Sequence, residues 1–343
     1  MSSWKTDGVV LKNARLIDGT GAGPRCVDVH VASGKIERIL PHIDDADIPA
    51  VDLDGATVLP PLIDSHVHLE SVPGSYYRDD SDEQLWTFRR QQLKAYPASG
   101  VTTVLDNGIS ARQLGEYQDY MQQGGVGPTI FALAPLFCPA GGYADALEMR
   151  MWGPFPTTAT ETEIDARYAE FEGFQNIIGV KVAIEPGMGP SKVWAVYDRK
   201  MLAAIAASAK KRGLPVHVHS LRQAEHQMAL DMGAYRLVHA GFFHGEPTDA
   251  FLNEVKQKGV YVSSTVASTV GQNLVMFDLS KLDDPLLELV VPKELLKTAR
   301  DPGAWKATMF KMIRVTSPKW MPDFIIRLML KVMNLEKELT RQL

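Results

Sequence analysis

From residue 57 onward, strand-like runs alternate with amphipathic helix-like segments, and this rhythm restricts the fold more than any other feature of the chain. Repeated strand–helix units form a parallel sheet that is covered by helices, so we predict an α/β fold. The length of the repeat favours a (β/α) barrel of the TIM type, although alternation alone does not separate a barrel from an open sheet. The seven predicted strands are Thr57–Leu62, Val101–Leu105, Thr129–Ala134, Ile178–Ile184, Pro215–His219, Arg236–His239 and Val260–Ser264.

Two segments flank the predicted barrel, which occupies residues 61–270. Residues 1–60 contain short runs of period-two alternation, such as Val27–Val31, and predict a small β-sandwich-like domain. Residues 271–343 predict a helical C-terminal segment, because their apolar residues recur at helical spacing. No eighth strand is recognised, so we expect an incomplete barrel whose open edge is covered by this segment or by a partner chain.

Charge and composition exclude several classes of protein. The 36 Lys and Arg residues against 41 Asp and Glu residues give a net charge of −5, which offers no basic excess for nucleic acid. No signal peptide and no apolar stretch of about 18 residues are recognised, so we expect a cytoplasmic protein without membrane contact. Because the cytoplasm is reducing, we expect Cys26 and Cys138 to be free thiols. The expected partners are a small-molecule substrate and a second copy of the chain, bound through the C-terminal helices.

The run Leu59–Leu69 contains the pattern His66-Val67-His68 after apolar residues. Side chains of a strand alternate between its two faces, so His66 and His68 point to the same side. At the carboxyl end of a barrel strand that side is the mouth, where the active sites of this fold lie. Two imidazoles spaced in this way converge on one cation, so we predict a metal site here.

Three further histidines and one lysine occupy comparable positions. His217 and His219 share one face of a predicted strand, and His239 ends the next strand. A single histidine of this kind is more often a core residue, but histidines at the ends of three strands point to a shared site. Lys181 interrupts an apolar strand, where it must pair with Glu185, lose its proton or be chemically modified.

At these residues, and in the run Gly100–Asp106, the chain resembles the amidohydrolase superfamily, nearest to its imidazolonepropionase-like and prolidase-like branches. The resemblance covers roughly residues 8–270. It implies that His66 and His68 bind one metal ion and that Lys181 is carboxylated and bridges two ions.

By position in the same family, His219 and His239 match the ligands of the second metal ion. His217 lies deeper on the same face, and we assign it together with Tyr143 to the substrate pocket. The resemblance implies one or two divalent ions, and the nitrogen and carbamate ligands favour zinc.

The implied activity is hydrolysis of carbon–nitrogen bonds in amides, cyclic amides or dipeptide-like molecules by a metal-activated water, in an enzyme class that excludes peptide bonds. The family's strand-eight aspartate has no counterpart here, so no catalytic base is assigned and we expect slow hydrolysis. The alternatives are a catalytically impaired metal-binding protein on a shortened scaffold, or a metal-dependent lyase or isomerase on the same barrel. A nucleobase deaminase is disfavoured, because its zinc signature is absent from the sequence.

Overall fold

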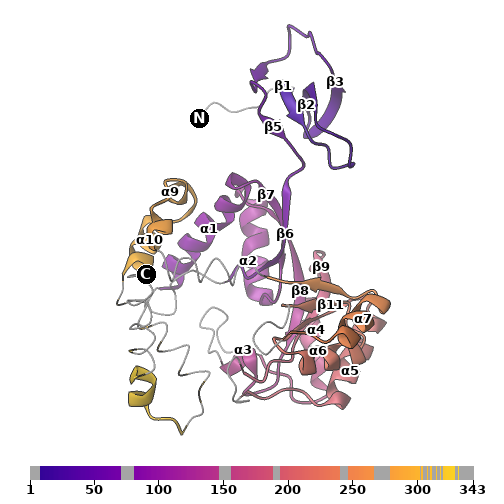
Figure 1. The fold of residues 1–343 in the computed structure, drawn as a ribbon, viewed down its shortest axis with the longest axis vertical. Coiled ribbons are helices and arrows are strands. Elements are labelled where there is room, and N and C mark those ends of the chain that lie inside the picture. The colour runs from indigo at the N-terminus through magenta and orange to yellow at the C-terminus, as the bar shows by residue number, and fades with distance from the viewer. Residues whose placement is uncertain are drawn as a thin grey trace. The chain divides into compact units, whose positions relative to one another are not determined.

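The computed structural model describes residues 8–70, 81–146, 156–187, 194–239, 246–265 and 279–301, and part of 303–331. It divides into two compact units, Met1–Leu62 and Ile63–Leu343. Figure 1 follows the chain through both of them.

The first unit is built on one mixed sheet in which β1 is central. β1 pairs antiparallel with β2 and parallel with both β4 and β5. β3 extends the sheet beyond β2, and the inner face buries a small cluster around Ala14 and Val29. The strands are β1 (Val9–Leu16), β2 (Arg25–Ala32), β3 (Lys35–Leu40), β4 (Ala50–Asp52) and β5 (Thr57–Val58). The described residues of this unit therefore form a single sheet, without a second layer opposite it.

The second unit contains a seven-stranded sheet, in the order β12-β11-β10-β9-β8-β7-β6. Pairing is parallel from β7 to β12. The strands are β6 (Leu62–Val67), β7 (Val101–Asp106), β8 (Thr129–Phe137), β9 (Ile177–Ala183), β10 (Val216–His219), β11 (Arg236–Val238) and β12 (Tyr261–Ser263). The prediction of seven strands is confirmed for the described part of the chain.

The predicted boundaries of the first barrel strand, Thr57–Leu62, are wrong. Residues 57 and 58 form β5 and pair with β1 of the first unit, whereas the barrel strand β6 begins at Leu62. Pro60 and Pro61 separate the two strands, because proline has no backbone N–H for a sheet ladder. His66 therefore lies inside β6, and His68 follows directly after it.

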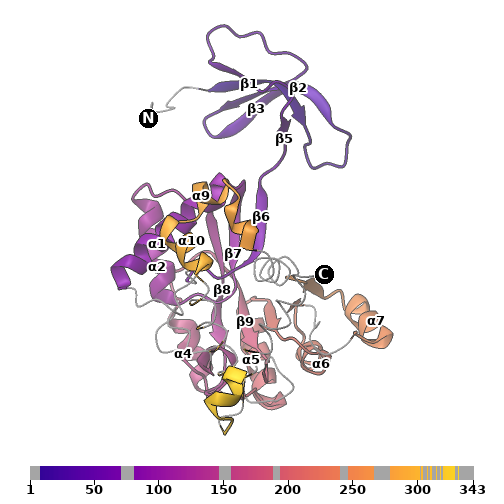
Figure 2. The same ribbon diagram turned by 60° about the vertical axis from the view of Figure 1, so that its left-hand side comes forward.

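Helices follow the strands and begin at side-chain caps. The Ser81, Ser110, Asp198 and Thr248 side chains accept hydrogen bonds from backbone amides of the first turns of α1, α2, α5 and α7. Figure 2 shows α4 and α5 near the lower ends of β8 and β9, with α6 and α7 farther to the right. The helices are α1 (Asp82–Ala98), α2 (Ala111–Gln122), α3 (Tyr143–Ala146), α4 (Glu163–Ala169), α5 (Arg199–Lys211), α6 (Gln223–Asp231), α7 (Asp249–Gln257), α9 (Leu287–Val290) and α10 (Lys293–Arg300), with a 3₁₀ helix at Leu279–Asp283.

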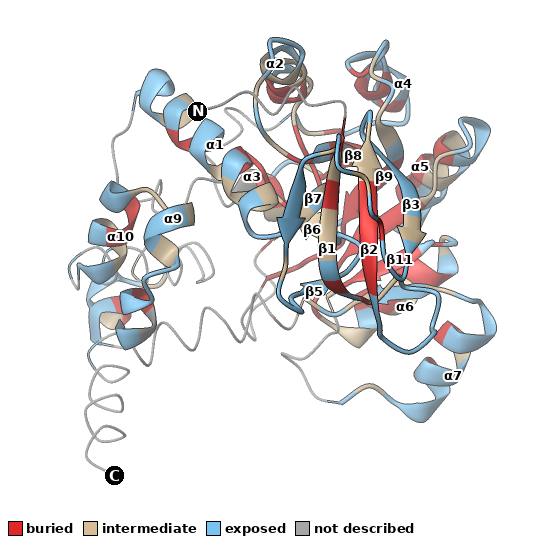
Figure 3. Ribbon diagram, turned by 90° about the horizontal axis from the view of Figure 1, so that it is seen from above, coloured by how far each residue is buried: buried red, intermediate tan, exposed pale blue. Residues whose placement is uncertain are grey.

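The barrel strands divide their side chains between two environments. Val180 and Val182 of β9 pack in a cluster with Ile205 of α5 and Val218 of β10, between the sheet and the helices. Lys181, which lies between the two valines, therefore faces the opposite side of the sheet. Figure 3 shows buried residues along β8, β9 and α5, with exposed residues on the outer faces of the helices. The polar residues discussed below lie on the inner side.

The sheet curls strongly enough to bring its two ends close together. Arg236 of β11 donates a hydrogen bond of 3.1 Å from Nη1 to the backbone oxygen of Ser65 in β6, although four strands separate β11 from β6 in the sheet. Between β6 and β12 no ladder pairing occurs among the described residues. The sheet is thus a nearly closed barrel with a gap between β6 and β12.

The C-terminal segment packs in part on the barrel. Leu295 of α10 contacts the cluster formed by Phe88 of α1. The remainder of the predicted tail lies partly outside the described residues, so the predicted homo-oligomer stays a prediction, as does cytoplasmic location. No described helix is long and apolar enough to cross a membrane.

Gly179 of β9 is required by close packing on the inner side of the barrel. A Cβ atom there would lie 2.9 Å from each of His217 Nε2, Leu133 Cδ2 and the backbone oxygen of Pro215. We expect Gly179→Ala to lower the free energy of unfolding by about 1–3 kcal/mol, because the backbone oxygen cannot move aside easily. Denaturant-induced unfolding measures the change.

The matched control is Gly115→Ala in α2, where the nearest atom to an added Cβ is 3.9 Å away. Alanine in a helix is more favourable than glycine by about 0.5–1 kcal/mol, so this variant should be as stable as wild type or more stable. Equal stability of Gly179→Ala and wild type would contradict the described packing of β9 against β10.

Candidate metal centre

His66 and His68 approach each other closely on the inner side of β6. Their Nε2 atoms are 3.3 Å apart. The chain after His68 is anchored by two hydrogen bonds, from the Leu69 amide to Asp106 Oδ2 at 2.7 Å and from Tyr117 Oη to the Leu69 oxygen at 2.7 Å. The backbone around the pair is therefore fixed by β7 and α2 rather than by β6 alone.

His219 and His239 form a second close pair. His219 ends β10, His239 follows β11, and the distance from His239 Nε2 to His219 Nδ1 is 3.0 Å. His239 adopts the left-handed backbone region with φ of 70°, which is uncommon for a residue other than glycine and is often found at functional sites.

The tautomer of His239 follows from its neighbour Thr265. The Thr265 hydroxyl donates to the Ser264 oxygen at 2.8 Å, so its oxygen accepts from His239 Nδ1 at 2.6 Å. Nδ1 then carries the hydrogen, and Nε2 accepts the hydrogen bond that His219 Nδ1 donates, which leaves the lone pair of His219 on Nε2. A histidine that ligates a metal through one nitrogen commonly donates a hydrogen bond through the other.

The two pairs meet in one cluster. The ring centroids of His66 and His239 are 5.2 Å apart, and those of His219 and His239 are 4.7 Å apart. Four of the predicted ligands, from three different strand ends, are thus brought together as the sequence predicted, although their role as ligands stays a prediction.

The donor set fits a divalent ion as two chelating pairs. Tetrahedral zinc with Zn–N bonds of about 2.0–2.1 Å requires a nitrogen–nitrogen distance of about 3.3–3.4 Å. The distance between His66 Nε2 and His68 Nε2, 3.3 Å, matches this value, whereas the 3.0 Å between His239 Nε2 and His219 Nδ1 is shorter. His219 Nε2 is buried and has no hydrogen-bond partner among the described residues. Within the described residues no three His, Cys, Asp or Glu side chains already surround a single point. The four rings therefore form two pairs, His66 with His68 and His219 with His239. Each ion would need further ligands from other side chains or from water.

Lys181 is buried near this cluster without an acidic partner among the described residues. Its Nζ lies 3.4 Å from Asn107 Oδ1, an atom that also accepts a hydrogen bond of 2.7 Å from Arg236 Nη2. Glu185 instead accepts hydrogen bonds from the backbone amides of Gly187 and Leu221, so the Lys181–Glu185 ion pair considered above is not formed. Burial, and secondly the Arg236 charge, lower the pKa of Lys181 well below its ordinary value, which favours a neutral or modified amine.

The two residues assigned to the substrate pocket lie in different places. The Tyr143 ring stacks on His219 with centroids 4.1 Å apart, so it lies against the histidine cluster. His217 instead lines a separate cavity with Tyr235 and Arg236, and none of the four clustered rings lines that cavity. Asn107 and Arg236, which also contact Lys181 and Ser65, were not predicted as site residues. Arg236 is the first residue of the predicted strand Arg236–His239. A charged side chain at the start of a buried strand could have indicated a polar contact inside the barrel.

Burial keeps the histidine rings neutral. It lowers the pKa values of His68, His217 and His239 to about 3 each, with the Lys181 charge second for His68 and His239 and the Arg236 charge second for His217. Metal ligation requires neutral imidazole, so the cluster is prepared for a cation at neutral pH.

We expect the ring NMR signals of His68, His217 and His239 to remain those of neutral imidazole from pH 8 to pH 5 in chelator-treated protein. An ordinary histidine titrates near about 6.5. Because the folded-state pKa values are lowered, the unfolded chain binds protons first, and these rings reduce stability as the pH falls below about 6.5. A midpoint near the ordinary value for any of the three would contradict their burial.

The chain is similar to known proteins both in sequence and in three-dimensional structure. Residues 57–299 match the model of the Amidohydrolase family. An allantoinase of Streptomyces avermitilis is 38% identical over 107 residues, which are 30% of this chain and 21% of that protein. A dihydroorotase of Carboxydothermus hydrogenoformans is 33% identical over 73 residues, 21% of this chain and 17% of that protein. The chain thus aligns with about a fifth of the length of each of these relatives.

Solved structures share the fold. One described as an amidohydrolase has a TM-score of 0.63 at 21% identity, covering 90% of this chain and 76% of the other. A Xaa-Pro dipeptidase with bound methionine in its active site has a TM-score of 0.63 at 20% identity, covering 90% and 77%. These similarities confirm the predicted TIM-type barrel with an N-terminal β domain.

Proposed function

Because the chain belongs to the amidohydrolase family, we propose that it is a metal-dependent hydrolase that acts on carbon–nitrogen bonds. The observation that carries this proposal is the convergence of four histidine rings from three strand ends, with His219 buried and the other three half-buried. Imidazole rings that are withdrawn from water reduce stability unless their nitrogens have partners. A bound cation supplies those partners.

In this proposal each histidine pair holds one ion. His66 and His68 chelate the first through their Nε2 atoms, and His219 and His239 contribute to the second. Lys181 becomes a ligand once it is carboxylated, because a carbamate replaces a poorly satisfied buried amine with oxygen donors. Nitrogen ligands together with a carbamate favour zinc over other first-row metals.

A divalent ion bound there would lower the pKa of a water molecule to about 7 and polarise the scissile carbonyl. Side chains next to the ion would shape the space that the substrate enters. Tyr143 covers one face of His219 and forms a wall of the site. Among the described residues no carboxylate hydrogen-bonds or ion-pairs with the rings of His66, His219 or His239, so the group that accepts the proton of the water is not assigned.

Amides and cyclic amides are the proposed substrates, since two similar proteins are named allantoinase and dihydroorotase. Peptide bonds are not excluded. The earlier expectation of an enzyme class without peptide substrates is unsupported, because a Xaa-Pro dipeptidase is among the proteins of the same fold. Dipeptides therefore belong in the substrate panel.

We expect the purified chain to hold one or two divalent ions, as the family membership implies, with zinc as the proposed metal, and His66→Ala/His68→Ala to lose at least one of them. The double variant removes both nitrogens of one chelating pair. Elemental analysis after dialysis against zinc-containing buffer measures the stoichiometry. His42→Ala, at an exposed histidine of the first unit that pairs with Asp28, is the control and should leave the stoichiometry unchanged. Equal zinc content in wild type and the double variant would refute the assignment.

For Lys181, we expect substitution by alanine to lower the metal stoichiometry toward one, with partial recovery when short carboxylic acids are added. The acid would occupy the space of the missing side chain and supply the oxygen ligands of the carbamate. In the wild-type protein, labelling with ¹³C-bicarbonate should give a carbamate signal in the ¹³C spectrum that Lys181→Ala lacks. A zinc-loaded protein with an unmodified Lys181 amine would exclude this role.

Turnover separates a hydrolase from the two alternatives. With saturating zinc we expect measurable hydrolysis in a panel of allantoin, dihydroorotate, simple amides and Xaa-Pro dipeptides. We expect a kcat below the ordinary range of about 1–10³ s⁻¹, because loss of a positioned base typically costs about 10²–10⁴ in rate. Full zinc occupancy without any turnover would favour a catalytically impaired metal-binding protein. Conversion of a substrate without incorporation of ¹⁸O from water would favour a lyase or isomerase.

A further inference from the structure

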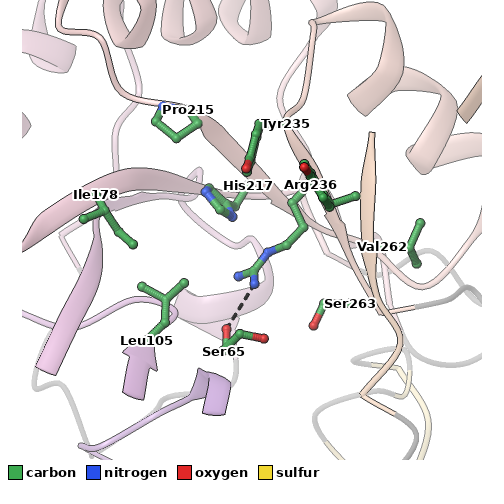
Figure 4. Close-up of a pocket in the computed structure, with 10 residues that line it drawn as sticks. Ser65, Leu105, Ile178, Pro215, His217, Tyr235, Arg236, Val262 and Ser263 are labelled. Atoms are coloured by element: carbon green, nitrogen blue, oxygen red, sulfur yellow. Dashed lines mark hydrogen bonds between the residues drawn. The ribbon is translucent and has the colours of Figure 1, made fainter. Parts of the chain in front are cut away.

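A cavity of about 420 Å³ lies between the two end strands of the barrel sheet, β6 and β12, and is separate from the histidine cluster. Figure 4 shows the side chains around it, with Arg236 and His217 directed into the space. Its lining residues are Ser65, Leu105, Ile178, Pro215, His217, Tyr235, Arg236, Tyr261, Val262 and Ser263. The cavity lies within the volume range of about 300–1,000 Å³ typical of small-molecule sites.

Two of the lining side chains are buried and incompletely satisfied. Arg236 is 7% exposed and His217 is 4% exposed. Arg236 Nη1 and Nη2 donate to the Ser65 backbone oxygen and to Asn107 Oδ1, both uncharged acceptors, whereas Nε has no partner among the described residues. His217 has no hydrogen-bond partner at either ring nitrogen within the same residues. Donors of this kind normally find partners when they are buried.

The charge around the cavity is unbalanced. None of its ten lining residues is Asp or Glu. Arg236 shares the Asn107 oxygen with the Lys181 amine, so the guanidinium meets only neutral acceptors among the described residues. The carboxylate of Asp106 is engaged elsewhere, because its two oxygens accept the backbone amides of Leu69 and Gly108. A buried guanidinium ordinarily has a carboxylate or phosphate partner, and here no described residue supplies one.

We propose that this cavity is a second binding site, which takes a small organic oxyanion, a carboxylate or a phosphate ester, on Arg236 and His217. The guanidinium offers charge-assisted hydrogen bonds to the oxyanion, and the neutral imidazole adds one further donor. Ser263 contributes a hydroxyl in the same lining. The site does not depend on the proposed hydrolase activity, because none of the clustered metal-ligand candidates lines it.

The remaining lining indicates that the anion carries an apolar body. Leu105, Ile178 and Pro215 form part of the wall. At the mouth Tyr261 and Val262 are 60% and 52% exposed, so the cavity opens to solvent past an aromatic ring and an aliphatic side chain. An aromatic or aliphatic group attached to the oxyanion would cover this exposed apolar surface, which contributes about 25 cal/mol per Å² buried.

The test is a titration of the full chain with benzoate, acetate, phenyl phosphate and inorganic phosphate at constant ionic strength, followed by calorimetry and by the ring nitrogen signals of His217. We expect saturable binding at one site per chain, with benzoate tighter than acetate or phenyl phosphate tighter than inorganic phosphate. The tighter of benzoate and phenyl phosphate identifies the oxyanion. Arg236→Gln should weaken binding about tenfold or more, because it removes a charge-assisted contact. Arg112→Gln, at an exposed arginine of α2, is the control and should leave binding unchanged.

Two further variants keep the test decisive. Val262→Trp changes an exposed position at the mouth and should block binding even if Arg236→Gln does not fold. His66→Ala/His68→Ala should retain binding, which separates this site from an anion held by metal in the histidine cluster. Binding that survives both Arg236→Gln and Val262→Trp, binding that disappears in the histidine double variant, or no saturable binding of any probe would overturn the proposal.

Discussion

The structure of the second unit depends on the alternation of side chains along its parallel strands, between an apolar face packed on the helices and a polar face inside the barrel. On β9 the valines at 180 and 182 face the helices, while Gly179 and Lys181 face the inside of the barrel. The register extends this inner layer across the sheet, since His217 pairs with Lys181 on one side and with Arg236 on the other. The hydrophobic layer between the sheet and the helices thus surrounds polar groups that must be satisfied by one another or by a ligand. Both proposed sites are consequences of this requirement.

Asn107 links the two regions of the barrel interior. It follows β7, and its amide oxygen accepts hydrogen bonds from both Lys181 and Arg236. Its amide nitrogen donates to the backbone oxygens of Ser65 and Leu105, which fixes its orientation. Carboxylation of Lys181 would change the charge next to this amide, and an anion on Arg236 would act on the same atom from the other side. One neutral side chain therefore stands between the proposed metal ligand and the proposed anion site.

Much of the fold could be predicted from the sequence, because strand and helix periodicities are local properties. Six of the seven barrel strands begin and end within a few residues of the prediction, and the Amidohydrolase family match confirms the resemblance carried by His66, His68, Lys181, His219 and His239. The boundary near Pro60 was misjudged because an apolar run alone does not reveal which sheet it joins. Asn107 and Arg236 were missed because their partners are 74 and 171 residues away in the chain. His217 was assigned to the substrate pocket, yet its ring lines a different cavity from the clustered histidines, which only the register and the curl of the sheet determine.

The central claim is that the four clustered histidines hold a divalent cation. The most direct measurement is an anomalous difference map, recorded above and below the zinc absorption edge from crystals grown with zinc. The account predicts a strong peak within about 2.0–2.3 Å of the Nε2 atoms of His66 and His68, with a second peak beside His219 and His239 if two ions bind. A map with zinc present in the crystal and no peak near either pair would contradict it.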